Sequence, residues 1–599
     1  MAVITGERPV SAGDTRQSEI HRAHRRRESL RRRTSSEGGI AFLLVAVLYL
    51  VCGSILAFHY HAFFGDAVSR MANGFYVLYS RDPHLAAIGF VWNPLQSVTD
   101  IVPLLLYHLW PALATRDMAG TIVSSLCMAG ATYQLLCAFR EWGVARAPRL
   151  ILAALFALNP LVIFYGANGM SEALYLFTLV AVFRYLARWV RNDGASSLAY
   201  AGVALGFCYL TRNEAVAPAV TAGALVLVLS FWRADGSRRI RVQRGFTDLA
   251  VFLFPFVTCF AGWAIVSYVI TGSFFDQFTS VYGTSAQIQA GAGGPQMHLV
   301  SAIGLEGRAL LYLAPLLAVA ALLAILSAVR RRDVLILVPL SVIASGLAFD
   351  LVAYVSGGII WSFRYCIAAI PLDIALVGVI LAGMQPRKIE GEAPSNEHAA
   401  APAASTQARA GQRRTLHTAV LVAFAVVMIA PSLFTTAAGM FNPRVGVEET
   451  RVLGYVFHSH PSAVDRGYAQ NYQKSQDIAS FVANLKLTDG DVVVDNSSPC
   501  IPLAIVVSPN PKVFVIPNDR DFQRILADPL TFHAHYILVP PGGGQGSLTA
   551  TNRLYPALYG TGEGAGGPKF ATLVHAFSGA GACPSFRLYR VTQHPDIVE

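Results

Sequence analysis

The chain has 599 residues, of which 54% are hydrophobic and 14% are charged, and its mean hydropathy is +0.47. These values exclude an ordinary soluble globular protein. The net charge of +10 does not indicate nucleic-acid binding, because the arginines cluster in short loops between apolar runs, where they set the orientation of membrane helices.

Apolar runs long enough to cross a bilayer recur along the sequence, which predicts a polytopic α-helical membrane protein. We expect eleven spans, at about residues 39–58, 118–139, 150–165, 171–189, 198–210, 215–232, 249–270, 310–329, 334–355, 366–384 and 417–439. One more apolar run, Val98–Leu113, contains Asp100, Pro103 and Pro111. It is shorter than the roughly 20 residues that a span needs.

The distribution of arginine decides how Val98–Leu113 is placed. Loops rich in basic residues alternate with loops that carry few charges. The basic loops lie at about residues 140–149, 184–191, 233–244, 330–332 and 387–388. They share one face with the basic N-terminal segment only if Val98–Leu113 is an interfacial or re-entrant helix. We therefore predict a cytoplasmic N-terminus, an extracytoplasmic C-terminus and a long outer loop over residues 60–115.

Two segments lack apolar periodicity and are expected to be disordered and cytoplasmic. Residues 1–38 are polar and rich in arginine, and residues 385–416 form a linker rich in alanine, proline and serine. Neither segment can bury enough apolar surface to offset the entropy of the chain. The transmembrane domain therefore covers residues 39–384, and the last span follows the linker at 417–439.

Residues 440–599 are expected to form a small extracytoplasmic α/β domain. Segments typical of strands alternate there with helical patterns. The strands are expected at 491–495, 512–516, 535–539 and 586–591, and the helices at 472–485 and 521–527. In this oxidising location Cys500 and Cys583 can form a disulfide. The other six cysteines lie in or beside apolar runs, where cysteine is usually a packing residue.

Under this topology, four polar clusters converge on the outer face of the membrane. They are His59, His61, Asp66 and Arg70; Asn168, Ser171 and Glu172; Thr211, Arg212, Asn213 and Glu214; and Trp361, Ser362, Arg364 and Tyr365. A long loop rich in glycine, serine and glutamine, Thr271–Glu306, can close over a ligand beside them. Their joint placement favours a functional site at the outer membrane surface.

The acidic residues of these clusters also have a structural interpretation. Asp66 lies just beyond a helix end, where a charge costs little, so it can be a solvated or capping residue. Glu172 opens an apolar run, where the helix dipole favours an acid.

The basic residues can likewise be structural. Arg212 can simply pair with Glu214 across its turn, and Arg364 beside two aromatic residues is typical of an interfacial anchor. His59 and His61 are typical interface residues, because no third ligand is spaced to complete a metal site.

Several motifs in the first 230 residues resemble those of a known family. They are FFGDAVSRM around Asp66, VWNPL around Asn93, LNPLVIFYGANGMSEALYLFTLVAVFRYLARW around Glu172, and GFCYLTRNEAVAP around Arg212. Together they resemble the GT-C-type glycosyltransferases, polytopic proteins that use polyprenyl-phosphate sugars. Eleven spans followed by an outer domain also resemble the actinobacterial cell-envelope mannosyl- and arabinosyltransferases. The lone Asp66 departs from the double acid of some subfamilies, which leaves metal dependence open.

This resemblance implies roles for the polar residues. Asp66 would be the general base that takes the proton of the acceptor hydroxyl as its oxygen attacks the anomeric carbon with inversion. Glu172 matches the second acid of the family and would orient the acceptor, a cation or an arginine. An arginine or a metal would stabilise the departing phosphate, with Arg212 and Arg364 as first candidates and Arg308 as third. The remaining residues expected to bind substrate are Arg70, Glu214, Asn93 and His61.

The preferred hypothesis is therefore a membrane glycosyltransferase that acts at the extracytoplasmic face. It would move mannose or a pentose from a polyprenyl-phosphate donor to a cell-envelope glycan, glycolipid or protein. The resemblance leaves the cofactor open, with a divalent cation as the one candidate, and nucleic acid is not an expected partner. Two alternatives stay open. The first is a transporter or flippase, which predicts polar, broken helices near the midplane; in this chain Asp350 and Asp373 are the main charges within apolar runs. The second is a non-catalytic assembly scaffold that would work through its outer domain.

Overall fold

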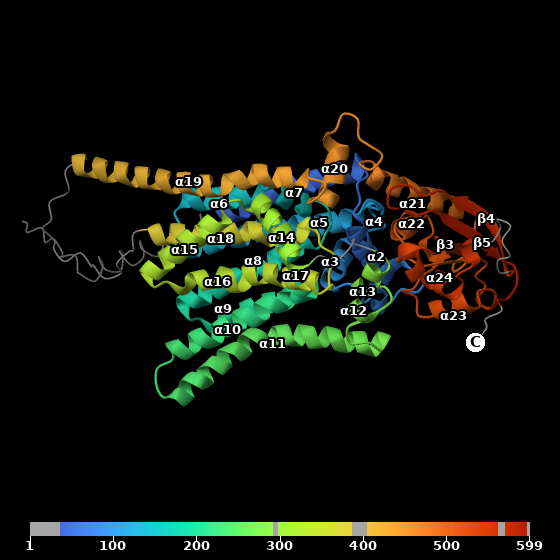
Figure 1. Cartoon of the computed structure of the whole chain (residues 1–599), viewed down its shortest axis with the longest axis horizontal. Helices are drawn as coiled ribbons and strands as arrows, with labels where there is room; N and C mark the ends of the chain where they lie inside the picture. Colours follow the sequence, from blue (N-terminus) through green and yellow to red (C-terminus); the bar gives the residue numbers. More distant parts are fainter. Residues whose placement is uncertain (1–35, 292–297, 386–403, 561–568, 596–599) are drawn as a thin grey trace, which may run out of the picture.

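The computed structural model describes residues 36–291, 298–385, 404–560 and 569–595. In this part of the chain a long bundle of helices forms one end of the molecule and a small α/β domain forms the other (Figure 1). Nearly all of the N-terminal tail predicted at 1–38 lies outside the described residues. The same holds for residues 386–403 of the predicted linker, whereas its remainder from Ala404 onwards is the first part of helix α19 (Ala404–Met440).

Among the described residues, eight helices are long and apolar enough to cross a membrane. They are Ser36–Phe58, α5 (Met118–Glu141), α8 (Glu172–Asn192), Asn213–Arg233, which contains α10 (Val216–Arg233), α11 (Arg238–Thr271), Val334–Val355, which contains α16 (Leu337–Pro339) and α17 (Ser345–Val355), Phe363–Met384, which contains α18 (Ala369–Met384), and Thr415–Met440 in α19. Each coincides with a predicted span. The predicted fold class, a polytopic helical domain followed by a small α/β domain, is confirmed.

The other three predicted spans are helical but are not straight spanning helices. Helices α6 (Arg146–Ala157) and α7 (Pro160–Gly166) meet at 64°, and α14 (Leu299–Leu313) and α15 (Leu317–Arg331) meet at 81°. A proline lies at each break, Pro160 at the start of α7 and Pro315 between α14 and α15. Proline cannot continue a preceding helix without losing a hydrogen bond. Helix α9 (Ala195–Thr211) is apolar but has only 17 residues.

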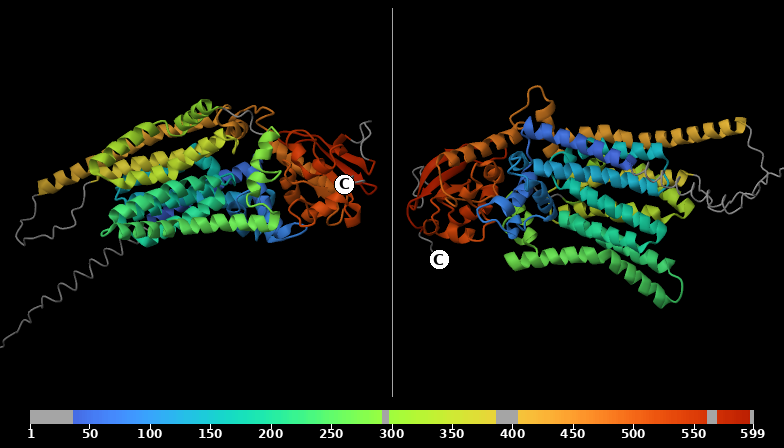
Figure 2. Two further views of the ribbon diagram at one scale, coloured as in Figure 1. Left: turned by 60° about the horizontal axis from the view of Figure 1, so that its bottom comes forward. Right: turned by 180° about the vertical axis from the view of Figure 1, so that it is seen from behind.

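The bundle has a buried centre and an apolar periphery. Helices α5, α8 and α18 are mostly buried, whereas few side chains of α11 and Ser36–Phe58 are buried. Figure 2 shows α11 along one edge of the bundle, and its exposed side chains include Phe254, Val257 and Ile265. Exposed apolar side chains on a bundle surface are suited to contact with lipid.

The predicted outer loop folds into short helices at the bundle end that faces the α/β domain. They are α2 (Gly65–Tyr79), η1 (Leu85–Ile88), α3 (Leu95–Leu104) and α4 (Ala112–Thr115). The run Val98–Leu113 thus forms parts of two short helices and the turn between them, with no element of spanning length. Apolar side chains remain exposed along it, including Leu106, Leu109 and Trp110. The location of this run at the membrane interface stays a prediction. The exposed apolar surface is suited to such a location.

The α/β domain is built on a five-stranded sheet of order β2-β1-β3-β5-β4. The strands are β1 (Val492–Val494), β2 (Phe514–Val515), β3 (Tyr536–Val539), β4 (Ala571–Phe577) and β5 (Phe586–Val591). β1 pairs in parallel with β2 and β3, and β5 pairs antiparallel with β3 and β4. Helices α21 (Gly467–Asn484), α22 (Ile501–Val507), α23 (Phe522–Ala527) and α24 (Ala550–Leu554) complete it. The sequence did not predict β4, α22 or α24.

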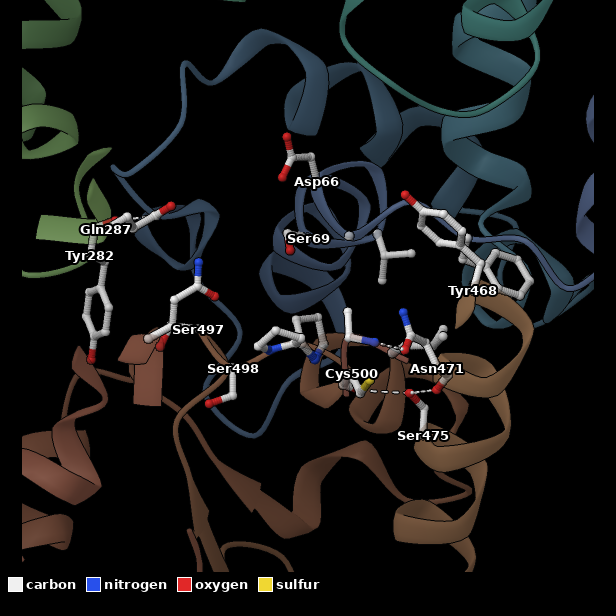
Figure 3. A pocket seen from close by; sticks show the side chains of 18 of the residues that line it. Asp66, Ser69, Tyr282, Gln287, Tyr468, Asn471, Ser475, Ser497, Ser498 and Cys500 are labelled. Carbon is white, nitrogen blue, oxygen red and sulfur yellow. Dashed lines mark hydrogen bonds between the residues drawn. The ribbon is translucent and has the colours of Figure 1, made fainter. Parts of the chain in front are cut away.

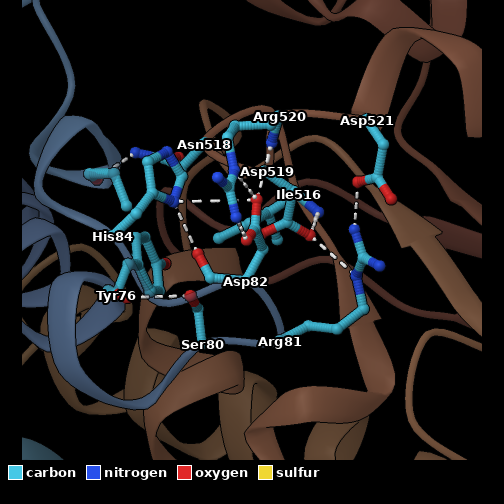
Figure 4. Close-up of polar contacts among 11 residues, drawn as sticks. Tyr76, Ser80, Arg81, Asp82, His84, Ile516, Asn518, Asp519, Arg520 and Asp521 are labelled. Atoms are coloured by element: carbon cyan, nitrogen blue, oxygen red, sulfur yellow. Dashed lines mark hydrogen bonds and ion pairs between the residues drawn. The ribbon is translucent and has the colours of Figure 1, made fainter.

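The α/β domain is fixed to α2 by a shared core and by ion pairs. Phe75 and Tyr76 of α2 belong to the same buried cluster as Ile501 and Leu503 of α22. Beside this core, two ion-pair sets join the α2–η1 connection to the loop before α23 (Figure 4). Arg81 pairs with Asp519 at 3.1 Å and also with Asp521, and Asp82 pairs with Arg520 at 2.5 Å. The domain therefore covers the end of the bundle at which α2 and Asp66 lie.

Candidate active site

Asp66 lies in the first turn of α2, at the end of the bundle that faces the α/β domain. Its Oδ2 accepts a hydrogen bond from Arg364 Nη2 at 2.7 Å, and its side chain is 32% exposed. One turn later, Arg70 Nη1 donates to the Asp66 carbonyl oxygen at 3.3 Å, and the Arg70 guanidinium lies 4.3 Å from the ring centre of Trp92. A carboxylate at a helix N-terminus is also stabilised by the helix dipole.

Arg364 gathers three carboxylates around one guanidinium. Besides Asp66, it approaches Glu172 Oε1 through Nε at 3.5 Å and Glu448 Oε2 through Nη1 at 3.5 Å. These acids come from the start of α8 and from α20 (Val447–Phe457), which follows the last span. The first outer loop, the start of the fourth predicted span, the outer turn before the tenth and the C-terminal segment therefore converge at one point.

Arg212 forms the second half of the same network. Its Nη1 lies 2.6 Å from Glu172 Oε1, and its Nη2 lies 2.5 Å from Glu214 Oε1. Its guanidinium also stacks 4.7 Å from the ring centre of Tyr365. Glu172 thus connects Arg212 with Arg364 and fixes the distance between the two guanidinium groups.

The charges around Asp66 keep its carboxyl ionised. Burial raises the pKa of Asp66, but the positive charges of Arg364 and Arg70 lower it by more, so that its pKa lies below the ordinary aspartate value. For Glu448 the balance is reversed: burial raises its pKa by more than Arg364 lowers it. At neutral pH Asp66 is therefore an acceptor of hydrogen bonds and of protons.

Asp66, Arg70, Arg212 and Arg364 line a cavity of about 630 Å³, which we call the arginine cavity. Asn93 and Glu214 belong to its polar part. One wall is apolar and consists of Phe349, Ala353, Ile359, Ile360 and Trp361. The arginine cavity thus combines concentrated positive charge with an apolar surface at the end of the membrane helices.

A second cavity, of about 320 Å³, lies between α2 and the α/β domain, and we call it the neutral cavity. Figure 3 shows Asp66 on one side of it and Ser498 and Asn471 of the α/β domain on the other. Asp66, Trp92 and Gln287 line both cavities. The Asp66 carboxylate therefore lies where a group in one cavity can meet a group in the other.

The structure brings most of the predicted site residues together. Asp66, Arg70, Asn93, Arg212, Glu214 and Arg364 line the arginine cavity, and Glu172 is buried against two of its arginines. The predicted closing loop also lies here, since α13 (Thr284–Gln289) contributes Thr284 and Gln287 to the arginine cavity.

The structure does not bring His61 or Arg308 into this site. The His61 ring stacks on Tyr472 at 5.1 Å, and its Nδ1 accepts from Arg116 at 2.5 Å. His61 has a φ of 49°, in the left-handed region, just before α2 begins. Arg308 is exposed on α14. Neither residue lines the arginine cavity or the neutral cavity.

Two residues of the site were not predicted from the sequence. Glu448 contacts Arg364, and the only sequence signal for it is a pair of acids shortly after the last span. Trp92 belongs to the VWNPL motif, but nothing in its local sequence indicates that its ring covers Arg70. Both contacts join segments that are far apart in the chain.

The residues present do not fit a divalent cation. Within the described residues, no group of three or more His, Cys, Asp and Glu side chains could hold a metal ion. Asp66, Glu172 and Glu214 each contact an arginine, so guanidinium groups lie where a cation would have to bind. The positive charge of this site comes from Arg70, Arg212 and Arg364.

The predicted disulfide of the α/β domain stays a prediction. Cys500 and Cys583 carry free thiols. Burial and, after it, the neighbouring Cys583 thiol raise the pKa of Cys500, so the two side chains are close to each other.

The fold and these cavities define a multi-pass helical membrane protein with a charged cavity beneath a small α/β domain. No family model and no curated protein matches the chain. It is similar to the crystal structure of ArnT from Cupriavidus metallidurans bound to undecaprenyl phosphate, with 12% identity over 92% of this chain and 97% of that one and a TM-score of 0.46. It is also similar to the oligosaccharyltransferase AglB from Archaeoglobus fulgidus in complex with an inhibitory peptide and a dolichol-phosphate, with 10% identity over 86% and 72% and a TM-score of 0.40.

Proposed function

We propose that this chain is an inverting membrane glycosyltransferase that uses a polyprenyl-phosphate sugar. The observation that carries the proposal is the position of Asp66, an ionised carboxylate that lines both a cavity rich in arginine and a cavity in which it is the only charged side chain among the described residues. A phosphate would bind on the arginine side, and a hydroxyl group would approach from the neutral side. The donor sugar would be mannose or a pentose, and the acceptor would belong to the cell envelope.

The arginine cavity suits a lipid phosphate. Arg70, Arg212 and Arg364 can donate charge-assisted hydrogen bonds to phosphate oxygens, and they would stabilise the charge that develops on the phosphate as the sugar leaves. The apolar wall, which includes Phe349, Ile359 and Ile360, would contact the first isoprene units. The rest of the prenyl chain would stay in the bilayer.

Asp66 would act as the general base. In the absence of donor its carboxylate is paired with Arg364, which makes it a weak base. A bound phosphate would compete for the same guanidinium, weaken this pair and raise the pKa of Asp66 towards the range in which proton transfer is efficient. Attack by the acceptor oxygen would break the bond between the anomeric carbon and the phosphate oxygen, while Asp66 takes the hydroxyl proton. Glu172 would be a positioning residue, since it holds Arg212 and Arg364.

We place this site at the extracytoplasmic face. The α10–α11 connection lies at the end of the bundle opposite the α/β domain (Figure 1) and is flanked by Arg233, Arg238 and Arg239, as the positive-inside rule requires for such an orientation. Cysteine labelling tests it: a membrane-impermeant maleimide should label Ser462→Cys in intact cells, and Ser237→Cys only after permeabilisation. The reverse pattern would place Asp66 on the cytoplasmic side. The unsubstituted chain gives the background from its own cysteines.

The activity is tested by incubating membranes that contain the chain with polyprenyl-phosphate mannose and with polyprenyl-phosphate pentoses. We expect release of polyprenyl phosphate and transfer of the sugar from at least one donor, with inversion at the anomeric carbon seen by NMR of the product. Membranes with the Asp66→Asn variant, expressed to the same level, are the control. Equal transfer by the variant, or retention of the anomeric configuration, would contradict the proposal.

A further inference from the structure

The neutral cavity continues into a groove on the surface of the α/β domain. This groove has a volume of about 250 Å³ and runs between the segment after β1 and the segments after β3 and β4. It shares Ser497, Ser498, Pro499, Gln545 and Ala582 with the neutral cavity. Asp66 lines the neutral cavity but not the groove. The two spaces therefore form one path that begins at the carboxylate and leads away from the membrane helices.

The side chains along this path carry almost no charge. Among the described residues that line the neutral cavity and the groove, Asp66 is the only charged one. The other polar groups are hydroxyls and amides, such as those of Ser69, Asn471, Ser498 and Gln545. Such groups both donate and accept hydrogen bonds, as the hydroxyls of a sugar do.

Aromatic rings accompany these polar groups. Trp92, Tyr282 and Tyr468 line the neutral cavity. Aromatic side chains with a polar end offer one apolar face and one hydrogen-bonding atom, which matches a sugar ring with its apolar face and hydroxyl edge. An anionic chain would find no cation on this path, although three arginines lie on the other side of Asp66.

We propose that this path binds the acceptor as an uncharged oligosaccharide of several units. The reactive hydroxyl of the terminal unit would lie at Asp66, and the preceding units would lie against Ser497, Ser498 and Gln545. This inference rests on the proposed function, because it assigns the acceptor of that same reaction. It makes the chain an enzyme that extends an existing glycan, with an affinity that increases with acceptor length until the groove is filled.

The test measures binding of defined sugars to the full-length chain in nanodiscs, by saturation-transfer NMR and calorimetry. The probes are mannose and arabinose oligosaccharides of one, two and six units, a six-unit oligosaccharide of uronic acids, and a serine- and threonine-containing peptide. We expect the neutral six-unit probes to bind at least about tenfold more tightly than the monosaccharides, with each neutral sugar contact adding to affinity.

A bulky side chain in the groove localises the binding. Gly543 is exposed, has an ordinary negative φ and leaves open space for a side chain, so Gly543→Trp should fold, and its indole would occupy the groove, because Gly543 lines the groove and not the neutral cavity. We expect it to weaken binding of the six-unit probe about tenfold and to leave binding of the monosaccharide and of polyprenyl phosphate unchanged. Leu573→Trp is the matched control, because Leu573 is exposed on β4 of the same domain and lines neither space.

The outcomes separate this inference from the proposed function. Equal affinity for one and six units, equal binding by Gly543→Trp and Leu573→Trp, or preference for the anionic or peptide probe would overturn the inference, even if sugar transfer depends on Asp66. Length-dependent binding that Gly543→Trp removes would support it. Full transfer by Asp66→Asn would overturn the proposed base, and the binding experiment would still report on the groove.

Discussion

The two cavities that meet at Asp66 differ in charge although they share a wall. The arginine cavity is lined by three arginines, of which Arg212 and Arg364 are held by Glu172, Glu214 and Glu448. The neutral cavity is lined mainly by hydroxyls, amides and aromatic rings. This difference divides the site into a part suited to an anion and a part suited to an uncharged hydroxylated group, with one carboxylate between them.

The two cavities also differ in the elements that build them. Helix ends and the segment after the last span build the arginine cavity, so its charges are held by the same packing that holds the bundle together. The neutral cavity is completed by the α/β domain, through α21 and the segment before α22. A change on the bundle side should therefore affect use of the donor, and a change on the domain side should affect the acceptor.

The largest expected effect is that of Asp66→Asn. The amide is nearly the same size as the carboxylate but cannot take a proton, so transfer should fall by about 100- to 10,000-fold. Binding of polyprenyl phosphate should persist, because all three arginines remain. The measurement is single-turnover transfer from a radiolabelled donor, with thermal unfolding as the control for folding. A rate within threefold of the wild type would remove Asp66 from the mechanism.

The second-largest effect on the transfer rate is expected from replacing Arg364, which contacts the donor phosphate in the proposed mechanism. Arg364→Ala removes a cation from the phosphate and should lower transfer by about 100- to 1,000-fold. It also leaves Asp66, Glu172 and Glu448 without their common partner, and a broken buried pair costs about 3–5 kcal/mol. Arg364→Lys keeps the charge and is the control for folding. The account fails here if Arg364→Ala, correctly folded, binds donor and transfers sugar as the wild type does.

Glu172→Gln should have a smaller effect, because Glu172 acts only through the arginines. The neutral amide holds Arg212 and Arg364 less firmly, and loss of one charge-assisted hydrogen bond lowers the rate by about tenfold. The reduction should appear in the KM for the donor as well as in kcat. A change in the KM for the acceptor alone would contradict the assignment of Glu172 to the donor side.

Breaking the ion pairs between α2 and the α/β domain should change stability more than chemistry. Arg81 donates to Asp519 and Asp521 and is 20% exposed. Arg81→Ala should therefore destabilise the docked domain by about 1–3 kcal/mol, measured by hydrogen exchange of α22. Arg520→Ala is the control: its side chain is 70% exposed, so a smaller loss is expected. If Arg520→Ala destabilises the domain more than Arg81→Ala does, the pairs of Arg81 with Asp519 and Asp521 are not what holds the domain on α2.

A change of pH near neutrality should have the smallest effect on the transfer rate. The pKa of Asp66 is lower in the folded chain than in an unfolded chain, so the ionised base is fully present from pH 6 to 8. Its pair with Arg364 contributes stability above about pH 4, which is lost as the pH falls through the lowered pKa. We expect kcat/KM to be level from pH 6 to 8. The acidic limb of kcat should lie at a higher pH than that of kcat/KM, because in the complex with donor the bound phosphate competes with Asp66 for Arg364. An acidic limb of kcat/KM above pH 6 that disappears in Asp66→Asn would contradict this.

The sequence was sufficient for the parts of the molecule that depend on local pattern. Apolar length predicts the helices directly, whereas the bends beside Pro160 and Pro315 were not predicted. Asp66, Arg212 and Arg364 were predicted because charged residues beside apolar runs are rare and were placed on one face by loop charge. Strand β4 was not predicted because it is an edge strand with exposed Leu573 and Val574 and a register shift, which weakens its alternation.

Contacts between distant segments could not be predicted in this way. Glu448 reaches Arg364 only because α20 folds back over the bundle, and the neutral cavity exists only because the α/β domain docks on α2. His61 shows the opposite error. It is close to Asp66 in sequence, but its ring contacts Arg116 and Tyr472. Nearness in sequence does not fix the direction of a side chain at a helix start.

The account depends above all on where the donor binds relative to Asp66. A structure of the chain with a polyprenyl-phosphonate sugar, which cannot be transferred, measures this directly. We predict that the phosphonate contacts Arg364 in the arginine cavity and that the anomeric carbon faces Asp66, with room for an acceptor oxygen at about 3–3.5 Å from that carbon. A phosphonate bound away from the three arginines, or a sugar that points away from Asp66, would contradict it.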